Sequence, residues 1–107
     1  MNELTKIDMA NLVLNEDKKA KIKNVLCTMY GATDVQYREF SYGICIDVTG
    51  TDSFRFVKNA ILKTLDVHEE TLSVLGESKR TLKASYAYLP EKDKVLSRRL
   101  KKAKVGF

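Results

Sequence analysis

A strict alternation of side chains between residues 41 and 48 places the tightest limit on the fold of this chain. Tyr42, Ile44, Ile46 and Val48 alternate there with small or polar residues, which are Ser41, Gly43, Cys45 and Asp47. Successive side chains of a strand point to opposite faces, so this segment predicts a strand with one buried and one open face. The apolar set, including Tyr42, is expected to point into the core.

Helical periodicity and further strand patterns complete a prediction of the α+β class. Apolar residues recur at helical spacing over residues 16–30 and 52–65. Three other segments have strand character: 35–38, 71–75 and 81–89. We therefore expect an antiparallel sheet packed by two helices, with turns at 39–41 and 76–80. Residues 12–14 are either a strand or the lead-in to a helix, and a strand there would give the order βαββαβ, which is ferredoxin-like.

The length and the position of the single proline suggest how the chain is divided. A chain of 107 residues with 44% hydrophobic residues fits one domain with one core. We assign residues 1–90 to a single α+β domain and residues 91–107 to a basic C-terminal helix or tail. Pro90 would end the last strand and suits the first turn of that helix.

The positive charge is concentrated at the C-terminal end of the sequence. Residues 91–107 contain seven basic and two acidic residues, which accounts for the whole net charge of +5. Lysine and arginine side chains that neutralise phosphates release condensed counterions, so this segment is suited to an anionic partner. The predicted nucleic-acid-binding residues are Arg98, Arg99, Lys101, Lys102 and Lys104, with Arg80, Lys83 and Tyr88 adding contacts from the domain.

Two functions follow from this charge distribution. The first is a small basic protein that binds RNA or single-stranded DNA through phosphate contacts, with little sequence preference. The alternative is a protein-binding regulatory or inhibitory module, of the kind that phages and mobile elements encode, docking on an acidic protein surface. For Tyr86 and Tyr88, a structural interpretation competes with nucleic-acid binding: they would form a core edge with hydroxyls in water.

The segment from Val25 to Leu65 resembles an RNA-recognition motif. The resemblance rests on Met29-Tyr30-Gly31 at the end of a helix, on the strand run from Ser41 to Ile46, and on the helix through Ala60-Ile61. It implies a ferredoxin-like fold whose open sheet face binds RNA through aromatic side chains. The alternation of residues 41–48 puts no aromatic side chain on the open face of that strand. Arg38 and Phe40 of the neighbouring strand are the candidates that remain on this face.

Catalysis and metal binding have little support in the sequence. His68 is the only histidine and lies among carboxylates in a polar connector, with no nucleophile paired with it. Cys27 and Cys45 form no CxxC pair, and together with His68 they lack the spacing of metal ligands. We therefore expect no enzymatic activity, no metal and no cofactor. Cys27 is expected to be a small, partly buried apolar residue. Cys45 faces away from the apolar side of its strand, so it would be reactive if exposed, or else covered by the C-terminal helix.

The remaining expectations concern location and assembly. No apolar run approaches the roughly 18 residues that a membrane span needs, and the first 14 residues lack the pattern of a signal peptide. Free cysteines without a disulfide framework suit a reducing compartment, so we expect a cytoplasmic protein without a membrane partner. An exposed strand at 71–75 or 81–89 could pair with a second copy, which would make a homodimer.

Overall fold

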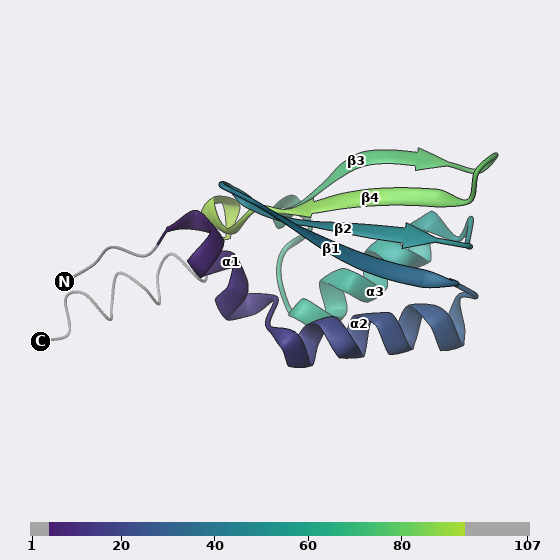
Figure 1. The fold of residues 1–107 in the computed structure, drawn as a ribbon, viewed down its shortest axis with the longest axis horizontal. Helices are drawn as coiled ribbons and strands as arrows, with labels where there is room; N and C mark the ends of the chain where they lie inside the picture. The colour runs from purple at the N-terminus through teal and green to yellow at the C-terminus, as the bar shows by residue number, and fades with distance from the viewer. Residues whose placement is uncertain (1–4, 94–107) are drawn as a thin grey trace, which may run out of the picture.

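The computed structural model describes residues 5–93 and shows an α+β fold (Figure 1). Within these residues, three α-helices, four strands and two short 3₁₀-helices follow one another. They are α1 (Lys6–Val13), α2 (Glu16–Met29), β1 (Asp34–Phe40), β2 (Gly43–Thr49), α3 (Phe54–Leu65), η1 (Glu69–Thr71), β3 (Leu72–Ser78), β4 (Lys83–Tyr88) and η2 (Pro90–Lys92). The predicted α+β class is confirmed.

The four strands form one antiparallel sheet in the order β1-β2-β4-β3. β4 therefore lies inside the sheet, and β1 and β3 are its edges. Helices α2 and α3 cover one face of the sheet, and no described element covers the other face (Figure 1). The predicted sheet packed by two helices is thus confirmed, and one whole face of it is left open.

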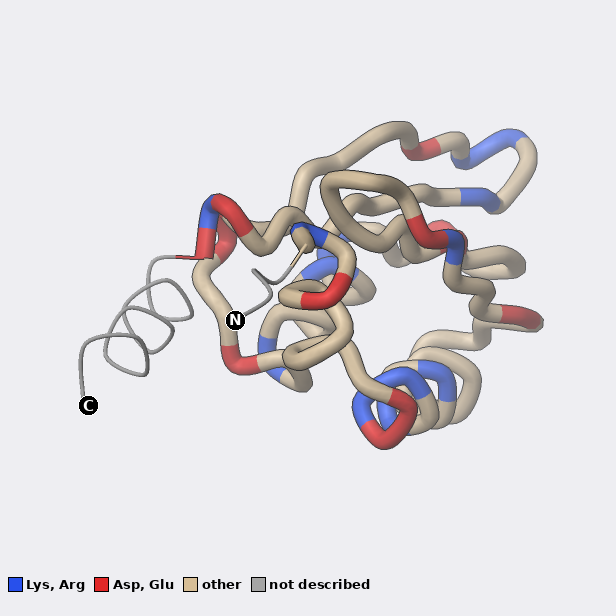
Figure 2. The backbone as a smooth tube through the Cα atoms, turned by 60° about the vertical axis from the view of Figure 1, so that its left-hand side comes forward, with Lys and Arg blue, Asp and Glu red and all other residues tan. Residues whose placement is uncertain are grey.

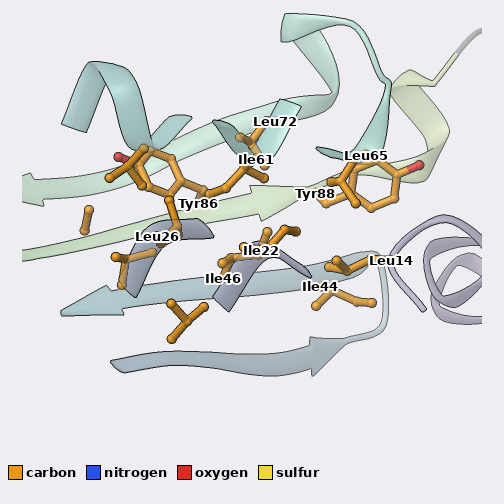
Figure 3. Packing of buried hydrophobic residues seen from close by; sticks show 14 of the residues in the cluster. Leu14, Ile22, Leu26, Ile44, Ile46, Ile61, Leu65, Leu72, Tyr86 and Tyr88 are labelled. Atoms are coloured by element: carbon orange, nitrogen blue, oxygen red, sulfur yellow. The ribbon is translucent and has the colours of Figure 1, made fainter. Parts of the chain in front are cut away.

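The core lies between this sheet and its two helices. Ile44, Ile46 and Val48 of β2 are almost completely buried, as their alternation predicts. They meet apolar side chains from both helices and from β4, many of which are drawn in Figure 3: Ile22, Leu26, Val57, Ile61, Leu65, Tyr86 and Tyr88. Burying each large side chain contributes roughly 1.5–3 kcal/mol, so this layer supplies most of the stability of the domain.

The N-terminal segment is helical, so the strand considered for residues 12–14 is wrong. Thr5 and Asp8 form a reciprocal capping box that satisfies free backbone N–H groups at the start of α1. Leu14 caps the other end, its N–H donating to the carbonyl of Ala10 at 2.9 Å, and its side chain is buried in the core. The order βαββαβ does not occur in residues 5–93, because the chain enters the sheet only at Asp34.

Helix α2 has the bounds that its end signals predict. The Asn15 side chain accepts a hydrogen bond from the N–H of Lys18 at 2.9 Å. Gly31 follows the helix with φ of +75°, a conformation that costs glycine nothing. Local sequence therefore decides both ends of this helix.

The β3–β4 hairpin differs from its prediction. β3 continues to Ser78, so the turn expected at residues 76–80 begins three residues late. Gly76 lies inside the strand, where the pairing with β4 shifts between Val74 and Gly76. Leu82 closes the turn with φ of +52°, which is unfavourable for a residue with a Cβ.

Residues 90–93 are part of the folded body. Pro90 is buried, Glu91 forms an ion pair with Lys6 at 3.0 Å, and Asp93 accepts a hydrogen bond from Tyr88. The domain boundary expected at residue 90 falls within this segment. Most of the helix predicted for residues 91–103 lies outside the described residues, and its described beginning is a 3₁₀ turn. None of the helices within residues 5–93 has the length and apolar character to cross a membrane.

Candidate nucleic-acid interface

The open face of the sheet is defined by alternate residues of β1 and β4. Tyr37 and Glu39 of β1 turn toward the helices, where the Tyr37 hydroxyl donates to the carbonyl of Lys19 at 2.8 Å. Their neighbours along β1, Gln36, Arg38 and Phe40, therefore point to the open side. On β4 the same rule places Lys83, Ser85 and Ala87 on the open side, because Ala84, Tyr86 and Tyr88 lie in the core.

An arginine–carboxylate pair occupies the middle of this face. Arg38 donates to Asp47 from Nε to Oδ2 at 2.5 Å and from Nη2 to Oδ1 at 3.0 Å, and the Ser85 hydroxyl donates to Oδ1 at 2.7 Å. Partial burial raises the pKa of Asp47, but hydrogen bonds from Arg38, Ser85 and Cys45 outweigh it and hold that pKa below its usual value. Asp47 thus stays ionised and neutralises Arg38.

Cys45 lies beneath this pair, in surroundings that make its thiol unreactive. Its Sγ accepts a hydrogen bond from Arg38 Nη2 at 3.3 Å and is shielded from solvent, although the residue belongs to the open face. Burial and the adjacent charge of Asp47 raise the pKa of the thiol. The thiol remains protonated, which argues against a reactive cysteine at this position.

A stacked aromatic pair lies at the end of the open face where β1 turns into β2. The rings of Phe40 and Tyr42 are 5.6 Å apart at their centroids and nearly parallel, and the Arg38 guanidinium lies 5.5 Å from the Phe40 centroid. Tyr42 is 45% exposed. The expectation that Tyr42 points into the core is wrong, because it lies in the turn before β2, where strand alternation does not hold.

Three basic residues gather at the opposite end, on the β3–β4 hairpin. Lys79, Arg80 and Lys83 are exposed, and none of them forms an ion pair with another residue of the described chain. Figure 2 shows this hairpin tip as a cluster of basic positions. A shallow groove of about 470 Å³ runs beside it, and its charged lining residues are Lys83, Arg38 and the acidic Glu77. The free positive charge of the open face is therefore concentrated at one end.

The predicted site residues have different positions in the structure. Arg80 and Lys83 are exposed, as nucleic-acid binding requires. Tyr88 is fully buried, and its hydroxyl donates to Asp93 Oδ2 at 2.9 Å, so its ring is not accessible for stacking on a base. Arg98, Arg99, Lys101, Lys102 and Lys104 lie outside the described residues.

The structural interpretation of the two tyrosines of β4 holds for their rings but not for their hydroxyls. Burial and a hydrogen bond to Asp93 raise the pKa of Tyr88, and burial and a hydrogen bond to Glu77 raise that of Tyr86. The Tyr86 hydroxyl donates to Glu77 Oε2 at 2.8 Å. Both hydroxyls are therefore bonded inside the protein rather than left in water, and Figure 3 shows them at opposite ends of the core.

The other candidate groups remain apart. His68 is exposed and precedes η1, Cys27 is half-buried, and residues 5–93 contain no cluster of three or more groups able to hold a metal ion. β4 has a partner on both sides, so the expectation that residues 81–89 could pair with a second copy is wrong. β3 is an edge and is the strand on which that homodimer hypothesis now depends.

Comparison with known proteins adds no relative. No protein-family model matches the chain, and no match was found among curated proteins or solved structures. Any assignment of function must therefore start from the surfaces described above.

Proposed function

We propose that this protein binds single-stranded nucleic acid, RNA or DNA, across the open face of its sheet, with the C-terminal segment adding phosphate contacts. The proposal is carried by one observation: a stacked aromatic pair and three basic residues that have no ion pair within residues 5–93 lie at opposite ends of the same uncovered face. Single-stranded nucleic acids are bound by this combination of stacking side chains and a positive groove.

The two ends would have different tasks in this complex. Phe40 and Tyr42 would stack on a base, a contact worth about 1–3 kcal/mol and largely independent of sequence. Lys79, Arg80 and Lys83 would contact phosphates. The two groups are separated by nearly the length of β4, about 20 Å for six residues. A strand of a few nucleotides is long enough to reach both.

Because the middle of the face is electrically neutral, we expect phosphate contacts at its hairpin end rather than evenly along it. Asp47 cancels the charge of Arg38, so phosphate contacts are concentrated at the hairpin. The basic residues of the C-terminal segment, Arg98, Arg99, Lys101, Lys102 and Lys104, form the second phosphate-binding element of the proposal. Affinity should then fall as salt rises, by an amount that grows with the number of phosphates contacted.

The test is the affinity of the full chain for a fluorescent single-stranded oligonucleotide, as RNA and as DNA, measured by anisotropy over a salt series. Arg80→Gln should weaken binding and reduce the salt dependence by about one ion. Arg55→Gln is the matched control, because Arg55 is also exposed, also lacks an ion pair within residues 5–93, and lies on the helical side in α3. No binding at low salt, or an affinity that salt does not change, would overturn the proposal.

The alternative function, a protein-binding module, is supported by a different surface. This surface is a groove on the helical side of the molecule, between α2 and α3.

A further inference from the structure

A groove lies between α2 and α3 and has no role in the binding proposed for the open face. It has a volume of about 560 Å³, which is in the range of ligand-binding clefts. Its apolar floor comes from both helices: Val25, Met29 and Tyr30 from α2 and its end, and Phe56 and Ala60 from α3. Lysines and small polar side chains complete the lining.

The groove is lined by a second stripe on each helix, which lies next to the stripe that builds the core. Helix α3 buries Phe54, Val57, Ile61 and Leu65 against the sheet, whereas Phe56, Ala60 and Lys63 line the groove. Helix α2 likewise buries Ile22 and Leu26 and turns Val25 and Met29 to the groove. Tyr30 and Ala60 also pack against the core, but Met29 and Phe56 do not belong to it. Folding of the described domain therefore does not account for these two large apolar side chains.

Two large apolar side chains of the groove are open to solvent. Phe56 is 58% exposed and Met29 is 68% exposed. The Phe56 ring stacks on Tyr30, with centroids 6.0 Å apart, so the aromatic end of the groove is already ordered. Clustered exposed apolar residues mark interaction sites, and a preformed aromatic anchor is a common centre of binding energy.

The charge around this floor is of one sign. Lys18, Lys21 and Lys63 line the groove, and none of its described lining residues is acidic. Lys21 forms an exposed ion pair with Asp17 at 3.3 Å, whereas Lys18 and Lys63 have no ion pair within residues 5–93. A partner that fills this groove must therefore have an apolar stripe flanked by negative charge.

We propose that the groove between α2 and α3 binds an acidic amphipathic helix of another protein. The apolar stripe of such a helix would cover Met29 and Phe56, and its carboxylates would pair with Lys18 and Lys63. This is the helix-in-groove mode of recognition, in which anchors recur at i, i+3, i+4 and i+7. Helices α2 and α3, which line the groove, lie on the side of the sheet opposite to its open face, so the two partners could be bound together (Figure 1).

Other occupants fit the lining less well. A nucleic acid would satisfy the lysines but leave the aliphatic floor of Val25, Met29 and Ala60 in contact with water. A second copy of this chain would bring the lysines of its own groove against Lys18 and Lys63, and like charges oppose that contact. A helix that is both apolar and acidic satisfies the floor and the rim together.

The experiment uses the full chain and a fluorescent peptide of about 16 residues, long enough to form a helix. The peptide has leucines at i, i+3, i+4 and i+7 and glutamates at most other positions. One control peptide has the same composition in an order without a stripe, and another has lysines in place of the glutamates. We expect saturable binding of the striped acidic peptide and at least tenfold weaker binding of both controls.

Variants then place the peptide on the protein. Phe56→Ala should weaken binding at least about tenfold, as for the central anchor of an interface. Lys63→Glu should also weaken peptide binding, and the loss of affinity should be larger at low salt than at high salt. Matched controls on the open side, Leu75→Ala and Lys79→Glu, replace residues of similar exposure and should leave peptide affinity unchanged. Thermal unfolding of each variant shows that the fold is retained.

Several results would overturn this inference. They are the absence of saturable binding, equal binding of the peptide without a stripe, and insensitivity to Phe56→Ala. A wild-type dimer in sedimentation that Phe56→Ala dissociates would show that a second copy occupies the groove. Loss of oligonucleotide rather than peptide affinity in the groove variants would assign this surface to nucleic acid. Because Phe56 is remote from the open face, failure here leaves the proposed nucleic-acid binding standing.

Discussion

The two faces of the sheet use aromatic residues in opposite ways. On the helical face, Tyr86 and Tyr88 are fully buried and their hydroxyls are bonded to acidic side chains. On the open face, Phe40 and Tyr42 stack on each other and Tyr42 remains accessible. Strand alternation in β4 therefore buries one aromatic pair for stability, whereas the end of β1 and the turn after it leave the other pair available for a ligand.

The largest expected effect separates the two faces directly. Ile46→Ala removes most of a fully buried side chain of β2 and should lower the free energy of unfolding by about 2–5 kcal/mol. Phe40→Ala, on the open face, should lower it by about 1 kcal/mol but weaken oligonucleotide binding several-fold. Urea unfolding and anisotropy measure the two quantities. Equal losses of stability in the two variants would contradict the assignment of the faces.

The next effect tests the hydroxyls of the buried face. Tyr88→Phe removes the hydrogen bond to the buried Asp93 and should lower the free energy of unfolding by about 1–3 kcal/mol. Tyr42→Phe removes an exposed hydroxyl and should change it by less than about 0.5 kcal/mol. Because Tyr88 is not accessible, neither the affinity for an oligonucleotide nor its salt dependence should change in Tyr88→Phe. A loss of oligonucleotide affinity in Tyr88→Phe, with stability unchanged, would show that Tyr88 takes part in binding.

Asp47 provides a prediction in which stability and binding move in opposite directions. Its pKa is lower in the folded state, so its contribution to stability is present above about pH 4 and is lost as pH falls through the folded pKa. Asp47→Asn should remove that part of the acid dependence and cost on the order of 1 kcal/mol at neutral pH. It also frees the charge of Arg38, so oligonucleotide affinity should rise several-fold.

Acid titration of unfolding and anisotropy at neutral pH check this prediction. Gln36→Ala is the control for the loss of a polar side chain beside Asp47, because Gln36 is its cross-strand partner but its side chain donates to Asp34 instead. It removes the hydrogen bond that lowers the pKa of Asp34, so any change in acid dependence in this variant belongs to Asp34, and oligonucleotide affinity should not rise. If affinity fell with Asp47→Asn, the Arg38–Asp47 pair would be a ligand contact in its own right, and the neutral middle of the face would need another explanation.

The sequence predicted what depends on periodicity and local caps. The alternation at Ile44, Ile46 and Val48 gave the buried face of β2, and Asn15 and Gly31 gave the ends of α2. It failed where tertiary contacts decide. Residues 12–14 are apolar enough for a strand, and only the capping box at Thr5 signals that they continue a helix. In the sequence, Tyr42 continues the alternation of Ile44, Ile46 and Val48. In the structure it lies in a two-residue turn that precedes β2.

The candidate site was less predictable because it combines residues that are distant in sequence. Arg38, Asp47 and Ser85 meet only through the pairing of β1, β2 and β4, and no local pattern encodes that order. Predicting the groove between α2 and α3 would require knowing which apolar side chains of each helix remain outside the core. Arg80 and Lys83 could be proposed from charge alone, whereas the burial of Tyr88 follows from the central position of β4.

The smallest effect concerns strain at the basic end of the open face. Leu82 has φ of +52° in the turn that carries Lys79, Arg80 and Lys83, and its carbonyl accepts the N–H of Gly50 at 2.8 Å. A left-handed backbone costs a residue with a Cβ about 1–2 kcal/mol, but glycine loses more entropy on folding. Leu82→Gly should therefore raise the free energy of unfolding by up to about 1 kcal/mol. Leu82→Ala keeps the Cβ and should give no such gain in urea unfolding. If both variants were destabilised alike, the side chain of Leu82 would contribute more through its contacts than its backbone conformation costs.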